Sequence, residues 1–266
     1  EIIADAGNIS ITVQSGDLEV DLVRSDKDGN GTTVGVVYLE ATTGSIVEVD
    51  PQDADFDIVA KTLELKAGAS LGASGASLEL DVGVITIRAT DDVVLAFNGT
   101  IGINVETQGD IDISATGDLD VQRAQTGSGT VTLSAGDDLT LASIEGFNID
   151  LSAGTGSITE TTNGDADGAI DIVGTNLSLN AGTFIDLDTA VATIQTVTAT
   201  GRIVLDEQDS LIIEDSVTTD NGVVDLDLGS GNLTINGEVS SNETVTIDLP
   251  GSLNITGAGI SGDQGV

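Results

Sequence analysis

The chain has 266 residues, enough for one large domain or two ordinary ones, and carries 45 acidic residues against 7 basic ones. A formal net charge of -38 excludes nucleic acids and anionic membrane surfaces as partners, because both require clustered Lys and Arg. With His 0 and Cys 0, disulfides, thiol chemistry and the usual pairs of general base and nucleophile are excluded as well.

The hydrophobic residues are almost entirely aliphatic, at 39% of the chain against 2% for aromatic residues. A core must therefore be built from Val, Ile, Leu and Ala. The 34 Gly and 2 Pro indicate many tight turns without Pro-rich linkers. Helix formers such as Lys, Arg, Gln and Met are scarce or absent, while β-branched residues are abundant, so the composition predicts an all-β chain.

The first third of the chain alternates short strands with polar loops. The loop at 25–32, SDKDGNGT, interrupts the alternation, and so does the acidic stretch at 50–57, DPQDADFD. Pro51 cannot donate to a ladder, so this second stretch is expected to bulge from the stack. The strands expected around these loops lie at 8–13, 17–22, 33–39 and 45–49.

From residue 62 onward, apolar residues recur in pairs two positions apart, each pair followed by a short turn. Residues two apart point to one face of a strand, so each pair predicts one short strand with its apolar side inward. The pairs up to residue 128 are Leu63/Leu65, Leu78/Leu80, Ile85/Ile87, Val93/Leu95, Ile103/Val105, Ile111/Ile113 and Leu119/Val121.

An internal repeat at 129–158 organises this pattern. The run TVTLSAG at 130–136 returns as NIDLSAG at 148–154, so that Val131 maps onto Ile149. Leu139 maps onto Ile158 at a spacing that is longer by a single position. One repeat cannot bury its apolar face alone, whereas repeats stacked in register can. The repeat therefore predicts a parallel β-solenoid.

After Ile158 the period is interrupted once. Leu179 opens the next copy of the turn, and it follows Leu151 at a longer interval than the repeat allows. Removing 160–169, ETTNGDADGA, restores the register, so this stretch is expected to be an insertion loop on one corner, where it leaves the strands untouched. Strand and turn then alternate to the end, in coils of about 18–22 residues, roughly 13 in all. We expect one solenoid segment over 1–266, part of a longer protein.

The runs VTLSAGDDLTLASIEGFNIDLSAGTGSIT and NLSLNAGTFIDL resemble the shaft repeats of filamentous-haemagglutinin-like adhesins of bacterial two-partner secretion. The likeness covers about 62–260 and rests on the pattern L-x-A-G followed by G-D-L-x-L. The resemblance implies a right-handed parallel β-helix, secreted to the cell surface, that acts as the stalk of an adhesin. The chain lacks the N-P-N-G-I type of segment of the secretion domain, and its acidity exceeds that expected of the family.

Two polar loops have the oxygen spacing of calcium sites, since alternate residues of a tight loop can surround a hard cation. The same residue types are also ordinary at solvated turns, and this reading stays open. No helices flank the loops and the bidentate Glu is missing, so neither is an EF-hand. We expect calcium chelation to lower the melting temperature. The candidate ligands are Asn163, Asp165, Asp167 and Asp171 in the second half, and Asp26, Asp28 and Asn30 in the first.

The favoured function is structural: an extracellular stalk segment of a surface adhesin or fibre, without catalytic activity. Its partners would be neighbouring solenoid segments, identical subunits, or carbohydrate or protein of a host or cell surface, without nucleic acid or membrane insertion. One alternative is a self-assembling filament or surface-layer subunit, since an uncapped solenoid end can template the next subunit. The other is a carbohydrate-active β-helix enzyme, which would need carboxylate pairs such as Asp91-Asp92 or Asp137-Asp138, residues that are ordinary at turn corners.

Overall fold

The structure is a computed structural model that describes residues 1–4, 7–25, 35–51, 55–161 and 169–263. It is all-β, and its parallel strands stack into a β-solenoid of about 12 turns, which confirms the predicted fold class. The described residues include no helix that is long and apolar enough to cross a membrane. The chain divides into two compact units, 1–129 and 130–266.

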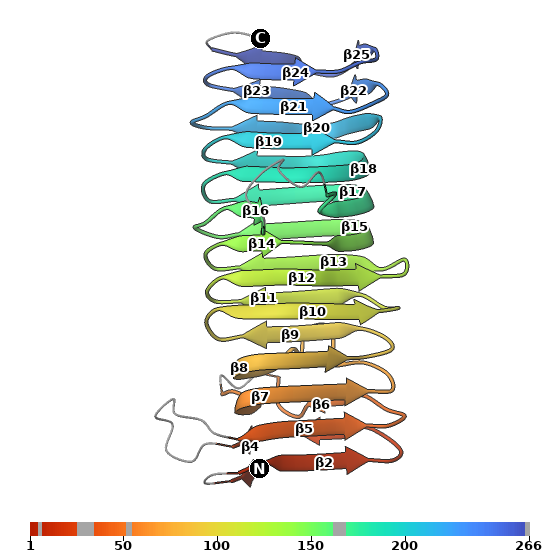
Figure 1. Ribbon diagram of the computed structural model, residues 1–266, viewed down its shortest axis with the longest axis vertical. Helices are drawn as coiled ribbons and strands as arrows, with labels where there is room; N and C mark the ends of the chain where they lie inside the picture. Colours follow the sequence, from red (N-terminus) through yellow and green to blue (C-terminus); the bar gives the residue numbers. More distant parts are fainter. Residues whose placement is uncertain (5–6, 26–34, 52–54, 162–168, 264–266) are drawn as a thin grey trace. The chain divides into compact units, whose positions relative to one another are not determined.

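Within its described residues the first unit holds twelve strands, drawn from red to yellow-green in Figure 1. They are β1 (Ile2–Ile3), β2 (Ile9–Val13), β3 (Leu18–Val20), β4 (Val23–Arg24), β5 (Val36–Ala41), β6 (Ile46–Glu48), β7 (Ile58–Ala67), β8 (Leu78–Arg88), β9 (Val93–Phe97), β10 (Ile101–Thr107), β11 (Ile111–Ala115) and β12 (Leu119–Thr126).

In the described part of the second unit, at 130–161 and 169–263, there are fourteen strands, drawn from green to blue in Figure 1. They are β13 (Thr130–Ala135), β14 (Leu139–Leu141), β15 (Ile144–Ala153), β16 (Ile158–Glu160), β17 (Ile172–Ala181), β18 (Ile185–Ala199), β19 (Ile203–Glu207), β20 (Leu211–Thr219), β21 (Val224–Leu228), β22 (Leu233–Ile235), β23 (Glu238–Ser241), β24 (Val245–Asp248), β25 (Leu253–Ile255) and β26 (Gly259–Gly262).

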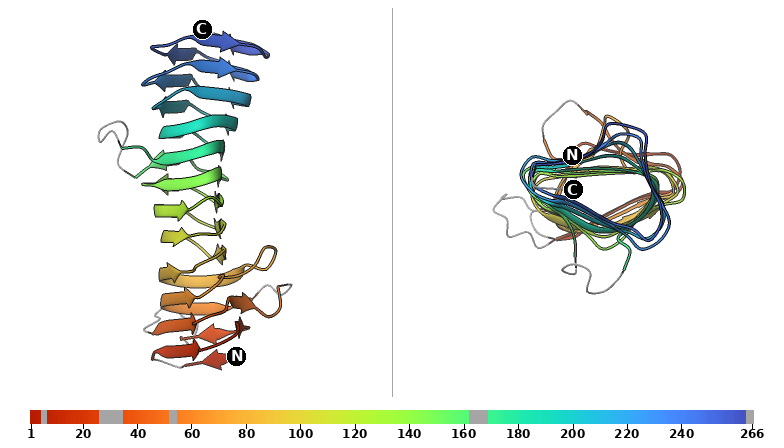
Figure 2. Two further views of the ribbon diagram at one scale, coloured as in Figure 1. Left: turned by 90° about the vertical axis from the view of Figure 1, so that its right-hand side faces the viewer. Right: turned by 90° about the horizontal axis from the view of Figure 1, so that it is seen from above.

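The register predicted from the internal repeat is confirmed. β13 pairs with β15 in parallel, with Val131 opposite Ile149, and β14 pairs with β16, with Leu139 opposite Ile158. Leu179 of β17 lies opposite Leu151, so the ladder continues across the longer spacing that the insertion produces. Figure 2 shows the successive strands of each unit as stacked arrows.

The core of each unit is a column of aliphatic side chains. In β10, β11 and β13 the inward residues alternate strictly with outward ones, as the sequence pattern requires. Leu63 and Leu133 are completely buried. Burying one such side chain contributes about 1.5–3 kcal/mol, which is why thin coils without aromatic rings can hold together. Gly99 follows the strand β9 with φ +88°, a conformation that favours glycine.

Side-chain oxygens at the corners tie each coil to the next. In each case an Asp or Asn that precedes a strand accepts a hydrogen bond from the backbone N–H at the same corner of the following coil. The bonds run to Asp17 from Ser45 N (2.8 Å), to Asp92 from Asp110 N (2.8 Å), to Asp138 from Ser157 N (2.8 Å), to Asp171 from Asp188 N (3.2 Å) and to Asn232 from Ser252 N (2.8 Å). These corner acceptors give a structural reason for part of the high Asp content.

The loop excursions predicted near 25–32 and 160–169 fall largely outside the described residues, and so do 52–54 of the one near 50–57. The course of these loops therefore stays a prediction. The single solenoid segment over 1–266 also stays a prediction, because the chain divides into two compact units.

Candidate functional site: three carboxylates at one corner

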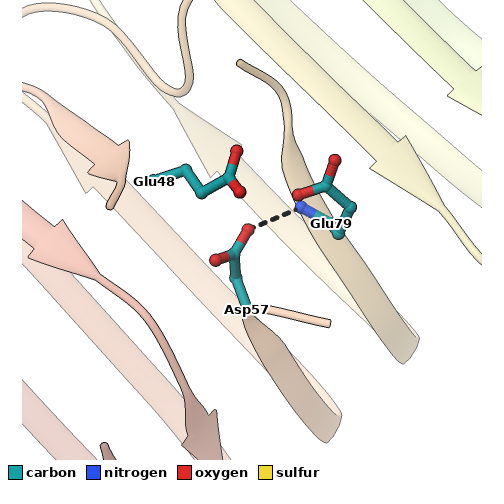
Figure 3. A group of neighbouring side chains, drawn as sticks. All are labelled: Glu48, Asp57 and Glu79. Atoms are coloured by element: carbon teal, nitrogen blue, oxygen red, sulfur yellow. Dashed lines mark hydrogen bonds between the residues drawn. The ribbon is translucent and has the colours of Figure 1, made fainter. Parts of the chain in front are cut away.

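Three acidic side chains meet at one corner of the first unit, as Figure 3 shows. Glu48 is the last residue of β6, Asp57 directly precedes β7, and Glu79 is the second residue of β8. Because Ile58 of β7 lies opposite Leu80 of β8, the ladder brings the two preceding residues, Asp57 and Glu79, side by side. The cluster is thus a product of the register.

The carboxylate oxygens of the cluster lie within 4.8 Å of one another. Asp57 Oδ2 accepts a hydrogen bond from the backbone N–H of Glu79 at 2.8 Å, the same corner bond that other coils make. Ser77 Oγ donates to Glu79 Oε1 at 3.2 Å. Asp57 is only 3% exposed, while Glu48 and Glu79 are half-buried. The most deeply buried acid is therefore the one that the other two surround.

Burial raises the pKa of Asp57 to about 8 from an ordinary value of 3.8. The backbone N–H of Glu79 opposes this rise, whereas the negative charge of Glu48 and the side chain of Glu79 add to it. Asp57 consequently carries a proton at neutral pH, although its two neighbours in the cluster are also acidic.

Two chemical uses fit this arrangement. The cluster can bind a proton, which Asp57 takes up near neutral pH. Its three carboxylate oxygens can also contribute to a site for a hard cation, which takes about six to eight oxygen ligands. Among the described residues, this is the one group of three or more His, Cys, Asp or Glu whose ligand atoms come this close.

Sequence reasoning missed this cluster. It expected the acidic stretch 50–57 to bulge from the stack, and at 78–80 it considered only the apolar pair Leu78/Leu80. The available signal was that Asp57 and Glu79 each directly precede an apolar strand residue, Ile58 and Leu80. Predicting the cluster from this signal requires the sequence separation between paired residues of β7 and β8. That separation differs from the separations in the neighbouring strand pairs, β5 with β7 and β8 with β9.

Most of the predicted calcium ligands lie outside the described residues, namely Asp26, Asp28, Asn30, Asn163, Asp165 and Asp167. Asp171 is described. It is buried, its Oδ2 accepts from Asp188 N, and its backbone N–H donates to Asp188 O at 3.0 Å. At least one of its carboxylate oxygens is therefore engaged with the next coil. Calcium binding by the two loops stays a prediction.

The two Asp pairs considered for catalysis lie at turn corners, as the sequence indicated. Asp92 accepts from Asp110 N at 2.8 Å. Asp138 accepts from both N and Oγ of Ser157, at 2.8 and 2.9 Å. Neighbouring Asp137 accepts from Thr155 Oγ1 at 2.7 Å. Three of the four carboxylates thus hold adjacent coils together.

The second unit contains a different kind of buried carboxylate. Glu207, the last residue of β19, is 2% exposed and accepts hydrogen bonds from Thr189 Oγ1 at 2.9 Å, Val191 N at 3.1 Å and Asp209 N at 3.2 Å. Burial raises its pKa, and these donors oppose the rise. Glu207 is held by neutral donors on the protein itself, so its role is structural.

Comparison with known proteins adds no relative: the chain matches no family model, no curated protein and no solved structure. The resemblance to filamentous-haemagglutinin-like adhesins therefore rests on the repeat pattern alone, and it stays a prediction.

Proposed function

We propose that the chain is a structural segment of an extracellular surface adhesin, in which stacked coils hold binding parts away from the cell. The observation that carries the proposal is the continuity of bonding from coil to coil in the second unit. β15, β17 and β18 pair in succession along most of the length of each strand. Corner acceptors such as Asp138 and Asn232 add side-chain bonds between coils.

This bonding suits a part that carries load. Parallel ladders place the interstrand hydrogen bonds along the stacking direction, so each coil is held by many bonds at once. The outward Asp and Thr residues add a polar surface. The acidic charge of -38 disfavours lateral pairing of such flat sheets.

A cell-surface display experiment tests the proposal. The full chain is fused between a surface anchor and a small fluorescent tag, and a Gly/Ser linker of equal length serves as the matched control. We expect the tag to sit at a narrow distribution of distances from the surface with the chain and at a broad one with the linker. Equally broad distributions would contradict a stalk.

Two further measurements separate the alternatives. Electron microscopy of the purified chain at physiological calcium gives isolated particles for a stalk and filaments for a self-assembling subunit. A screen against acidic and neutral polysaccharides is expected to release no reducing ends. Release of reducing ends would replace the structural proposal with a carbohydrate-active one.

A further inference from the structure

Asn–Gly pairs occur at three turns that the structure describes, at 98–99, 221–222 and 236–237. Two further pairs, at 30–31 and 163–164, lie outside the described residues. In such a pair the main-chain nitrogen of glycine can attack the side-chain amide of asparagine, because glycine has no Cβ to hinder the close approach. The reaction requires that the asparagine side chain can turn and that the glycine N–H is not held by another group. The three turns differ in both respects.

Asn236-Gly237 is the most firmly held pair. Asn236 Nδ2 donates to Glu214 Oε2 at 3.0 Å, and Thr256 Oγ1 donates to Asn236 Oδ1 at 2.7 Å. Gly237 N donates to Ile213 O at 3.3 Å. Both ends of the side-chain amide and the glycine N–H are therefore bound to neighbouring coils.

Asn98-Gly99 is held by a single hydroxyl group of the following coil. Gly99 N donates to Thr116 Oγ1 at 2.7 Å, and the same hydroxyl donates to Asn98 Oδ1 at 3.5 Å. Attack by the glycine nitrogen would have to break the shorter of these bonds. This turn is therefore protected mainly through Gly99.

Asn221-Gly222 is the least firmly held pair. Among the residues that the structure describes, Gly222 N donates to no acceptor. Asn221 is exposed, and its Oδ1 accepts one long hydrogen bond, from Asn242 Nδ2 at 3.4 Å. Neither the nucleophile nor the side chain that it would attack is fixed by a close hydrogen bond.

The sequence of the preceding coil explains this loose corner. At other corners an acidic side chain accepts from the next coil, as Asp138 does from Ser157 N. The backbone bonds that follow these corners place Arg202 where Asp138 stands and Val223 where Ser157 stands. A guanidinium group can only donate, so Arg202 offers no acceptor to the turn at Gly222.

The turn also has open space beside it. Asn221, Gly222 and Arg202 line a hollow of about 560 Å³, together with Phe184 and Glu243. The Asn221 side chain therefore has room to turn, and water can reach it. A Cβ at Gly222 would lie 2.5 Å from Arg202 N, so the close approach of the two coils requires glycine here.

We propose that Asn221 is a site of spontaneous deamidation. The nitrogen of Gly222 attacks Cγ of Asn221 and loses its proton, the side-chain nitrogen leaves as ammonia, and a cyclic succinimide forms. Water then opens the ring to aspartate or isoaspartate, so the net change converts an amide and water into an acid and ammonia. Either product adds a negative charge to the hollow that Glu243 lines, and isoaspartate also lengthens the main chain just before β21.

Mass mapping of peptides from the folded full chain, incubated at mildly alkaline pH, tests the proposal. We expect acid to form fastest at Asn221, more slowly at Asn98 and most slowly at Asn236. The ratio of Asn221 to Asn98 should be about two- to tenfold, the effect of one hydrogen bond. Asn221→Gln should form almost no acid at this position, because its longer side chain closes a less favourable ring.

Unfolding and one substitution separate the effect of the structure from that of the sequence. In denaturant all three pairs should react at similar rates, because each is Asn–Gly. In the folded chain Thr116→Val, which removes the acceptor of Gly99 N, should accelerate the reaction at Asn98 by about two- to tenfold. Exposed Thr246→Val is the matched control and should change none of the three rates.

Three results would overturn the proposal. The first is a folded chain in which Asn221 reacts no faster than Asn98 and Asn236. The second is the same ratio of rates in the folded and the unfolded chain, which would mean that the local sequence sets them. The third is an unchanged rate at Asn98 in Thr116→Val, which would show that binding of the glycine N–H gives no protection.

Discussion

Asp57 in the first unit and Glu207 in the second are both buried carboxyls, 3% and 2% exposed, but their surroundings are opposite in kind. Asp57 faces two further carboxylates and receives one backbone N–H, from Glu79. Glu207 receives a hydroxyl and two backbone N–H groups. Burial raises both pKa values, and only around Glu207 do all the side-chain and backbone hydrogen bonds oppose the rise. A coil can thus accommodate a buried acid either by protonating it or by surrounding it with donors.

The largest expected effect is a pH dependence of stability that comes from Asp57. Its folded pKa of about 8 lies above the ordinary 3.8, so the folded state keeps a proton that the unfolded state releases. The free energy of unfolding is therefore highest below about pH 4, falls as the pH rises to about 8, and levels off above it. At about 1.4 kcal/mol per pH unit the upper bound is about 6 kcal/mol. Denaturant unfolding over this pH range measures it.

Asp57→Asn is the matched control, because the amide keeps the shape and can donate to Glu79 while it cannot ionise. The general repulsion among 45 acidic residues lowers stability in the same direction, so the informative quantity is the difference between the two curves. We expect the variant to lose part of the slope and to be the more stable protein at pH 8. Parallel curves would show that Asp57 ionises normally.

Removing Glu207, the buried acid of the second unit, should lower the free energy of unfolding at neutral pH, whereas Asp57→Asn should raise it at pH 8. Glu207→Ala leaves Val191 N, Asp209 N and the Thr189 hydroxyl without their acceptor, and unsatisfied buried groups cost about 1–3 kcal/mol each. We expect a loss of about 2–4 kcal/mol by denaturant unfolding at pH 7. Exposed Glu238→Ala should change stability by less than about 0.5 kcal/mol. If Glu207→Ala left the free energy of unfolding unchanged, the proposed difference between Asp57 and Glu207 would be wrong.

Removing a carboxylate at a corner should lower stability by less than Glu207→Ala and by more than Glu238→Ala. Asp138→Ala removes the acceptor of both Ser157 N and Ser157 Oγ, and we expect it to cost about 1–2 kcal/mol. Adjacent Asp137 accepts from an exposed threonine hydroxyl, so Asp137→Ala should cost about 0.5 kcal/mol. Thermal melts of the two variants side by side measure the difference. Equal losses would mean that the backbone N–H finds another acceptor at the corner.

The smallest expected effect concerns an exposed bond between coils. Asn176 Nδ2 donates to Asn148 Oδ1 at 2.8 Å, one residue directly above the other in the ladder. Asn176→Ala should cost about 0.5–1 kcal/mol in denaturant unfolding. Thr193→Ala, at the next position of the same column, is the control and should cost less. If Asn176→Ala lowered the free energy of unfolding more than Asp138→Ala does, the expectation that more exposed hydrogen bonds contribute less would be wrong.

The parts of the fold that the sequence predicts are those with a regular period. Val131, Leu133 and Leu139 find their partners at the expected spacings because the turn between them repeats and leaves one register in which every apolar residue faces inward. The same argument locates the insertion after Ile158. Where successive coils have the same length and the same turn residues, the alternation of apolar and polar residues is enough to predict which residues pair.

The two irregular sites could not be predicted in this way. The pairs Ile85/Ile87 and Ile103/Val105 alternate as well as any others, yet within the described residues no backbone pairing joins β8 to β10. The spacing at which Leu80 pairs with Phe97 would place buried Ile103 opposite exposed Thr86. Likewise, Glu48, Asp57 and Glu79 come together only because coils in this region have unequal lengths. Local pattern does not report such differences in coil length.

The corner oxygens have a consequence for how such a chain can grow. Asp17, Asp92, Asp138 and Asn232 each accept a hydrogen bond from a backbone N–H of the following coil, so this contact is complete within two successive coils. A duplicated coil would bring its own acceptor and offer its own donor, and no third coil would need to change. The molecule can therefore be lengthened or shortened by gene duplication and deletion in whole turns, whereas a gain of one residue between corners would exchange the inner and outer faces of the strand that follows.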